Sequence, residues 1–177
     1  YQYAFAYCNS LATINLPTVL FIDESTFAYC TSLLSVNFAN VLSIGGNAFL
    51  NCSYLASANL PKCQIISTQA FKNCRLSSIS FPELFLLGSS VFGGNLRLLA
   101  ANLPNVIYIG NSCFTSCPLD TIQAENTQII GRSAFFNCSN LTTANFPNAI
   151  RIEYAAFANT SLTNINLSSA RLIEGLV

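Results

Sequence analysis

Histidine, methionine and tryptophan are absent from this 177-residue sequence, and only 8% of its residues are charged. A serine or cysteine nucleophile usually takes its general base from histidine, so the common catalytic triads are excluded. The seven acidic residues do not recur at a fixed place, which argues against a paired-carboxylate site. No glycine-rich phosphate loop is present either. We therefore expect no catalytic residues and no bound cofactor, and we predict that the chain is not an enzyme.

Charge is balanced as well as scarce, because seven basic residues offset the seven acidic ones. With no net field to attract polyanions, the sequence does not predict a nucleic-acid partner. Asn, Ser and Thr interrupt every apolar run before it reaches the roughly 20 residues of a membrane-spanning helix. The chain opens inside a repeat, without Met and without a signal-peptide pattern, so we interpret it as an internal piece of a longer protein.

A phenylalanine recurs every 21 or 22 residues, and internal repeats of this kind dictate the architecture. It occupies Phe5, Phe27, Phe49, Phe71, Phe92, Phe114, Phe135 and Phe157. Three residues later, six of the eight copies carry a cysteine: Cys8, Cys30, Cys52, Cys74, Cys117 and Cys138. A segment such as Leu11-Ala12-Thr13-Ile14-Asn15-Leu16 follows. In five copies a proline closes it: Pro17, Pro61, Pro82, Pro104 and Pro147.

Apolar residues alternate with polar ones in the segment before the proline, and this period of two predicts a strand with one face inward. Proline ends the strand because it cannot donate to a ladder. A second apolar stretch leads to the next phenylalanine. Four glycines, at which we expect a positive φ, lie in the bend after it: Gly45, Gly88, Gly110 and Gly131. No copy can bury its apolar residues alone, so the copies are predicted to stack as a repeat solenoid.

Two units, Gly45–Pro61 (GGNAFLNCSYLASANLP) and Gly131–Pro147 (GRSAFFNCSNLTTANFP), show the full pattern. It resembles the BspA-type (Treponema-type) leucine-rich repeat. The resemblance implies a leucine-rich repeat, right-handed β-rich superhelix of about eight 21–22-residue coils. The strand would lie on the concave face and short strand or turn segments on the convex side. We expect one such domain over residues 1–177, truncated in mid-repeat at both ends.

The same resemblance implies a function. Members of the family are mostly surface-exposed or secreted proteins of bacteria and some protozoan parasites, and several are associated with adhesion to host proteins or cells. It therefore implies an extracellular or cell-surface recognition and adhesion segment, with a host protein, a second copy or a glycan as partner. A rival hypothesis is a structural protein that self-assembles into fibres or lattices, because low charge and zero net charge favour association.

The cysteines could in principle bind metal or form disulfides. The nearest pair, Cys113 and Cys117, has no second pair beside it, so a zinc site is not predicted. Stacked copies place the six repeated cysteines in one column with parallel Cα–Cβ bonds, which suits disulfide geometry poorly. We interpret them as buried, inert thiols.

Two outward columns are candidates for partner binding. The first, on the strand, consists of Asn15, Asn37, Asn59, Asn102, Gln123, Asn145 and Asn166, with Ser80 in the remaining copy. It is either a hydrogen-bonding face for a partner or a ladder of amides that bond one another.

The second column follows the strand, where pairs such as Leu20-Phe21 and Ile107-Tyr108 cannot both point inward. Its candidate interface residues are Phe21, Ile65, Phe85, Tyr108 and Ile129. A contiguous exposed apolar patch usually marks an interface. The alternative is a bend in the chain that partly covers both residues of each pair.

Overall fold

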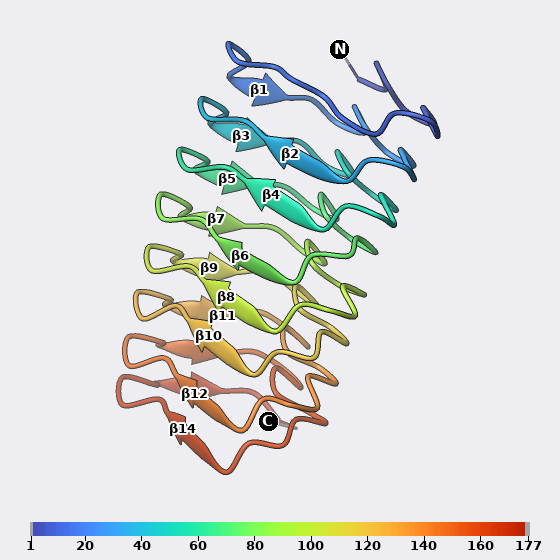
Figure 1. The fold of residues 1–177 in the computed structure, drawn as a ribbon. Coiled ribbons are helices and arrows are strands. Elements are labelled where there is room, and N and C mark those ends of the chain that lie inside the picture. Colours follow the sequence, from blue (N-terminus) through green and yellow to red (C-terminus); the bar gives the residue numbers. More distant parts are fainter. Residues whose placement is uncertain (1, 176–177) are drawn as a thin grey trace.

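The computed structural model describes residues 2–175, which form a solenoid of short parallel strands and contain no helix (Figure 1). One strand type has two residues: β1 (Phe21–Ile22), β3 (Ser43–Ile44), β5 (Ile65–Ile66), β7 (Leu86–Leu87), β9 (Tyr108–Ile109), β11 (Ile129–Ile130), β13 (Arg151–Ile152) and β15 (Leu172–Ile173). The other has three: β2 (Ser35–Asn37), β4 (Ser57–Asn59), β6 (Ser78–Ser80), β8 (Ala100–Asn102), β10 (Thr121–Gln123), β12 (Thr143–Asn145) and β14 (Asn164–Asn166). The predicted fold class, a leucine-rich repeat solenoid, is confirmed, and the eight phenylalanines bound seven complete units.

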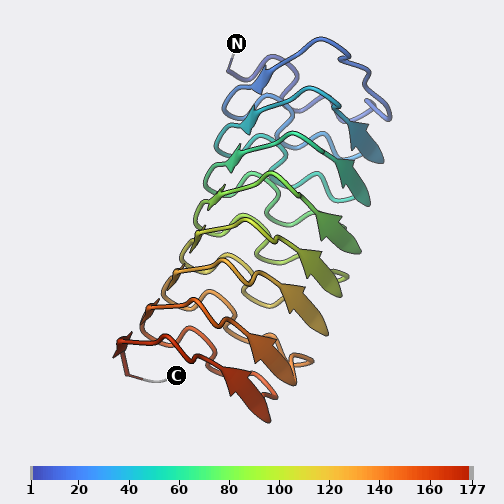
Figure 2. The ribbon, with the colours of Figure 1, turned by 90° about the vertical axis from the view of Figure 1, so that its left-hand side faces the viewer.

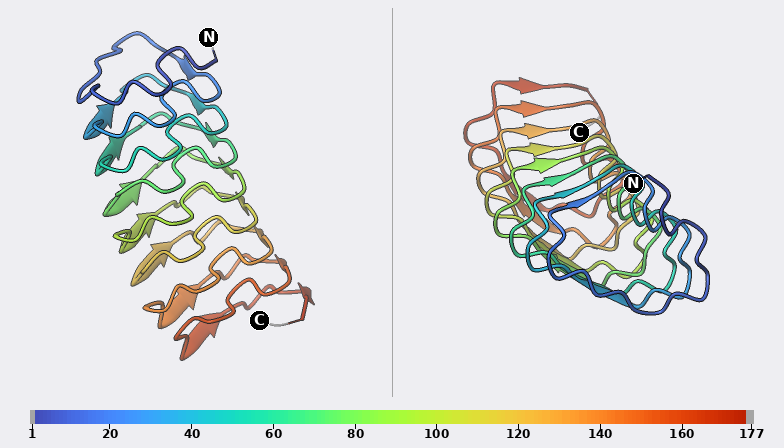
Figure 3. Two further views of the ribbon diagram at one scale, coloured as in Figure 1. Left: turned by 90° about the vertical axis from the view of Figure 1, so that its right-hand side faces the viewer. Right: turned by 90° about the horizontal axis from the view of Figure 1, so that it is seen from above.

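The strands form two ladders along the solenoid, as Figures 2 and 3 show. The odd-numbered strands make one continuous eight-stranded sheet in which each strand pairs in parallel with the next coil, for example Phe21 with Ser43. The even-numbered strands divide into three smaller sheets, β2–β4, β6–β8–β10 and β12–β14. Paired strand residues are 21 or 22 positions apart in the sequence, which is the length of one repeat. Equivalent positions of successive coils therefore lie side by side.

The repeated phenylalanines form one stack through the centre of the coils. Adjacent rings from Phe27 to Phe157 lie 5.0–5.9 Å apart between centroids, nearly parallel. Those from Phe27 to Phe135 are fully buried, together with the inward Ile or Leu of β3, β5, β7, β9, β11 and β13. Burial of one such side chain contributes roughly 1.5–3 kcal/mol, so the ring stack and its aliphatic surroundings hold the coils together.

Each phenylalanine lies in a turn whose backbone is left-handed at two places, two residues before and two residues after the ring. Both places have φ between 53° and 75° in all eight coils. Only one of the sixteen is a glycine, Gly94; Tyr7, Tyr29 and Ala155 are among the others. The turns hold this conformation because their N–H groups donate to the next coil, as Tyr29 N does to Leu50 O at 2.7 Å.

The expectation of positive φ at Gly45, Gly88, Gly110 and Gly131 was wrong, since none of them has it. Glycine is needed there because the backbone of the previous coil is too close for a side chain. A Cβ on Gly110 would lie 2.3 Å from the carbonyl carbon and oxygen of Gly88. The glycine column therefore sets how closely the coils stack at this bend.

Candidate partner-binding surfaces

The repeated cysteines from Cys30 to Cys138 are buried and have a structural role. Cys52 Sγ donates to the carbonyl oxygen of Phe27 at 3.1 Å, and the same bond to the preceding phenylalanine recurs in the neighbouring coils. Burial raises the pKa of Cys52, Cys63 and Cys138 to about 12. These thiols therefore stay protonated at neutral pH, and a protonated thiol is a poor nucleophile. All eight cysteines are free thiols, and of these Cys8 alone is exposed.

Residues 2–175 contain neither a metal-binding cluster nor a membrane-spanning helix. No group of three or more Cys, Asp or Glu side chains in this range is placed to hold a metal ion. The same residues contain no helix long and apolar enough to cross a bilayer.

The first candidate surface, which we call the amide face, consists of the outward third residues of the three-residue strands and Asn15. Its members are exposed, except that Asn102 is half-buried. Asn59 Nδ2 donates to Asn37 Oδ1 at 2.8 Å. Asn166 and Asn145 form the same bond at 2.8 Å. The face therefore contains short amide ladders, which use part of its hydrogen-bonding capacity along the sheet itself.

The amide face is hollowed where its ladder is interrupted. β10 and β12 belong to different sheets. Across them and β14 lies a depression of about 340 Å³, lined on its outward side by Gln123, Asn145, Asn166 and the hydroxyl residues Thr121 and Thr143. Hydroxyl and amide groups without a charge are suited to hydrogen bonding with a neutral partner such as a sugar or a peptide backbone.

The second candidate surface, which we call the apolar stripe, follows the eight-stranded sheet. It comprises the first residue of each odd-numbered strand and the residue before it, and none of these residues is buried. Phe21 is 59% exposed because β1 is an edge strand of the sheet and its partner on the next coil is the small Ser43. Phe85 is also exposed.

Ile65, Tyr108 and Ile129 are half-buried members of the apolar stripe. Tyr108 lies between Leu86 and Ile129 in the ladder, and these neighbours cover part of its ring. Burial, with a smaller contribution from Glu153, raises the pKa of Tyr108, so its phenol is neutral at physiological pH. The five sequence-predicted residues thus share one face, but Phe21 and Phe85 present more apolar surface than the other three.

A larger groove borders the apolar stripe at the turn that follows the proline position. Its volume is about 840 Å³, and it extends over four coils. Ile107 and Ile150 of the stripe form part of its lining, and both are exposed. Gln128 lies between them, and Arg171 lies on the last of the four coils and is the only charged lining residue. We call this the turn groove.

Three asparagines form the polar side of the turn groove: Asn105, Asn126 and Asn148. Each donates from Nδ2 to the carbonyl oxygen at the proline position of the preceding coil, as Asn105 does to Pro82 at 2.7 Å. These three residues were not among those predicted from the sequence. Their signal was present, because Asn recurs directly after the proline position at Asn40, Asn105, Asn126 and Asn148.

Comparison with known families identifies the repeat. The family model described as BspA type leucine rich repeat region, in six copies, matches residues 1–99 and 64–174. Together the two ranges cover nearly the whole chain. Among curated protein sequences, none matches significantly.

Three solved structures share the fold. A leucine-rich repeat protein from Bacteroides ovatus ATCC 8483 has a TM-score of 0.71 at 22% identity, over 98% of this chain and 53% of that one. A leucine rich cell surface protein from Faecalibacterium prausnitzii A2-165 has a TM-score of 0.56 at 19% identity, over 96% and 69%. A leucine-rich repeat protein of T. pallidum has a TM-score of 0.51 at 23% identity, over 88% and 70%. The chain thus spans about half the length of the Bacteroides protein, and the likeness concerns the fold alone.

Proposed function

Because this chain belongs to the BspA-type leucine-rich repeat family, we propose that it is a non-enzymatic recognition segment of a surface-exposed protein, with a protein partner bound along the apolar stripe. The observation that carries this proposal is the run of exposed apolar side chains along the eight-stranded sheet. It includes Leu20, Phe21, Phe85, Leu86, Ile107, Ile150 and Leu172. Polar residues such as Gln64 and Gln128 interrupt the run, yet exposed apolar side chains gathered on one face usually mark an interface.

Surface exposure is supported by the family and by the Faecalibacterium relative, which is described as a cell surface protein. The family and fold are those of repeat proteins that generally have no enzymatic activity. Fold alone does not assign a partner, so the partner's chemistry has to come from the surface itself.

The stripe and the turn groove together resemble the anatomy of a protein interface. Apolar anchors at Phe85 and Ile107 lie at its middle, and the amides of the turn groove form a polar rim. Because Arg151 is already paired with Glu153 and Glu174, Arg171 is the main charged group that this surface offers to a partner. Binding along the stripe should therefore depend only weakly on salt.

Replacement of Phe85 and Ile107 by aspartate tests this proposal. Both side chains are outward, so the double variant should fold, yet it places two charges in the centre of the interface. Binding to an array of immobilised host extracellular-matrix proteins would be measured by surface plasmon resonance. We expect at least a tenfold loss for each protein that binds the unmodified chain. The matched control is Leu34→Asp, an exposed leucine outside the stripe. Equal binding by the unmodified chain and the double variant would remove the stripe from consideration.

Self-association is the second candidate function, favoured by the zero net charge of a chain that carries this stripe. Sedimentation velocity distinguishes self-association from recognition of another protein. A monomer at micromolar concentration supports recognition of another protein. Fibres or defined oligomers that dissociate in the Phe85→Asp, Ile107→Asp variant would support a second copy as the occupant of the stripe.

A further inference from the structure

One coil breaks the regular row of turn side chains. The two residues after the repeated phenylalanine are Leu50-Asn51, Lys72-Asn73, Thr115-Ser116 and Phe136-Asn137 in four coils, but Gly93-Gly94 in the coil of Phe92. With no side chains at these two positions, a hollow of about 330 Å³ opens between the neighbouring coils. It lies on the phenylalanine-turn side of the solenoid, opposite the proline turns that border the turn groove (Figure 1).

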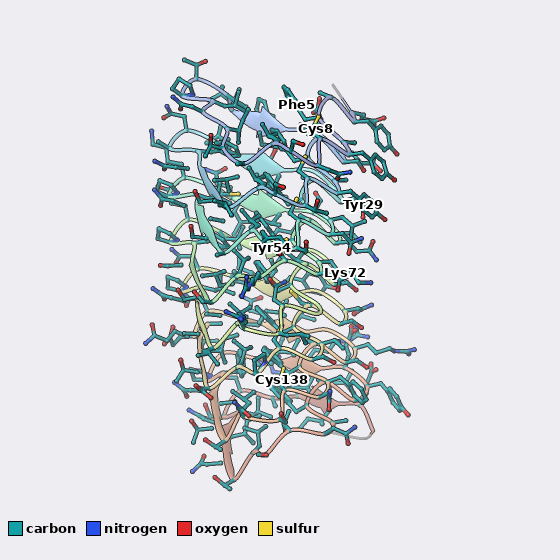
Figure 4. The ribbon with its side chains drawn as sticks, turned by 45° about the vertical axis from the view of Figure 1, so that its right-hand side comes forward. Phe5, Cys8, Tyr29, Tyr54, Lys72 and Cys138 are labelled. Atoms are coloured by element: carbon teal, nitrogen blue, oxygen red, sulfur yellow. The ribbon has the colours of Figure 1, made fainter. Side chains whose placement is uncertain are left out.

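The rim of this hollow supplies one cation and several hydroxyl groups. Lys72 comes from the preceding coil and lies on the same side as Tyr29 (Figure 4). The hydroxyls belong to Ser90, Ser112, Thr115 and Ser116, and no carboxylate contributes to the lining. Within residues 2–175, the ammonium group of Lys72 has neither an ion pair nor a hydrogen bond, and the residue as a whole is half-buried. The hydroxyl of Thr115 already donates to Ser133 O, which leaves the serine hydroxyls as donors. An ammonium without a partner beside such hydroxyls is suited to bind an oxyanion.

The floor of the hollow has the opposite polarity. The carbonyl oxygens of Ser112 and Ser90 lie 3.6 and 3.7 Å from the place that a Cβ of Gly93 would occupy. Both already accept a backbone N–H, yet a carbonyl oxygen has a second lone pair. A bare sulfate or phosphate ion would meet these oxygens with repulsion. A sugar that carries an anionic group would instead donate its hydroxyls to the floor and place the anion against Lys72.

We propose that the hollow beside Lys72 and Gly93 binds a single acidic sugar, through a carboxylate or sulfate group at Lys72 and sugar hydroxyls at the floor. The volume is near the lower end of the roughly 300–1,000 Å³ typical of small-molecule sites, which suits one monosaccharide. This site is separate from the apolar stripe, so it adds a glycan contact to the proposed recognition function and does not depend on it.

Nuclear magnetic resonance of the full chain tests the proposal, with the amide signals of Gly93 and Gly94 as reporters. Four probes separate the possible sources of the anion: N-acetylneuraminic acid, galactose 6-sulfate, neutral galactose and inorganic sulfate. We expect saturable shifts of both amides with at least one of the two acidic sugars, and shifts at least tenfold weaker with galactose and with inorganic sulfate. Equal shifts with inorganic sulfate, or no shift with either acidic sugar, would overturn the proposal.

Three variants test the groups that would bind the sugar. Lys72→Gln should weaken acidic-sugar binding at least tenfold, whereas Lys72→Arg should retain it. Gly93→Leu should abolish it by filling the hollow, and a side chain is sterically acceptable there because the nearest atom to its Cβ is 3.6 Å away. Lys62→Gln is the control, since Lys62 donates to Asn40 Oδ1 in a proline turn. Undiminished binding by Gly93→Leu would place the sugar elsewhere and refute the assignment.

Discussion

Asn95 Nδ2 donates a hydrogen bond of 2.8 Å to the carbonyl oxygen of Phe71, in the place where other coils use a cysteine thiol. The same amide also donates to Phe92 O at 2.8 Å and accepts from the Leu76 N–H at 3.2 Å. It is fully buried. The coil that carries Gly93 and Gly94 is thus tied to its neighbours by a stronger hydrogen-bonding group than a thiol.

Removal of this amide should destabilise the solenoid. Asn95→Leu leaves Phe71 O and the Leu76 N–H without their side-chain partner, at a cost of roughly 1–3 kcal/mol for each buried group. Asn95→Cys restores the residue found in six other coils and should lose less. Urea unfolding followed by circular dichroism provides the comparison. If the leucine variant is as stable as the cysteine variant, the amide contributes nothing beyond its volume.

The close approach of Gly110 to Gly88 predicts that a side chain at Gly110 lowers the thermal stability of the solenoid. Gly110→Ala places a Cβ 2.3 Å from the Gly88 backbone, so the coils must move apart and the melting temperature should fall by several degrees. Gly46→Ala is the matched control, because the nearest atom to its Cβ is 3.5 Å away and its φ is not positive. Its melting temperature should be unchanged or slightly raised. Similar melting temperatures for the two variants would contradict the role assigned to Gly110.

Two adjacent buried alanines allow a test of the left-handed turn. Ala155 has a φ of 55°, whereas Ala156 does not have a positive φ. Ala155→Gly relieves the steric conflict of a Cβ in this region and should raise stability by roughly 0.5–1 kcal/mol. Ala156→Gly only removes a buried methyl group and makes the unfolded chain more flexible, so it should lower stability by about 1 kcal/mol. Chemical denaturation measures both. Loss of stability in both variants would mean that the conformation at Ala155 carries no strain.

Alkaline pH should destabilise the fold through its thiols. Burial raises the pKa of Cys52 from 9.0 to about 12, so between these values the folded state holds a proton that the unfolded chain has lost. The free energy of unfolding therefore falls as pH rises through this window, by up to about 1.4 kcal/mol per pH unit for each such thiol. Below pH 9 this contribution is fully present.

Unfolding at pH 8, 9, 10 and 11 measures the slope. Cys52→Ala should reduce its steepness between pH 9 and 11, while Cys8→Ala, which replaces an exposed thiol, should leave it unchanged. Identical slopes for the two variants would show that the buried thiol does not govern the alkaline response.

Much of the fold was predictable because the repeat length is nearly constant. Phe49, Phe71 and the other anchors are separated by 21 or 22 residues, and like residues of stacked coils must then form columns. The period of two identified the three-residue strands, and the leucine-rich repeat solenoid followed. The residues of the amide face and the apolar stripe could be named from the same pattern, although their role in binding stays a prediction.

Other features depend on contacts between coils that a single repeat does not contain. Tyr7 and Tyr29 are residue types that rarely adopt a positive φ, and their rings stack 4.7 Å apart once the coils are in place. The turn groove needed the packing of Asn105, Asn126 and Asn148 over three successive coils. The hollow at Gly93 became visible only when Lys72 and Thr115 were placed on either side of it.

The sequence by itself determined the solenoid, its phenylalanine stack and the inward or outward direction of the residues in the three-residue strands, because all three follow from periodicity and burial of apolar groups. Only the tertiary structure explained the need for glycine in the bends. It also showed which turn residues have a left-handed backbone and where the surface is hollowed. These depend on distances between backbones of adjacent coils, such as the approach of Gly110 to Gly88. Such distances are set by the packing of the whole stack and not by any one repeat.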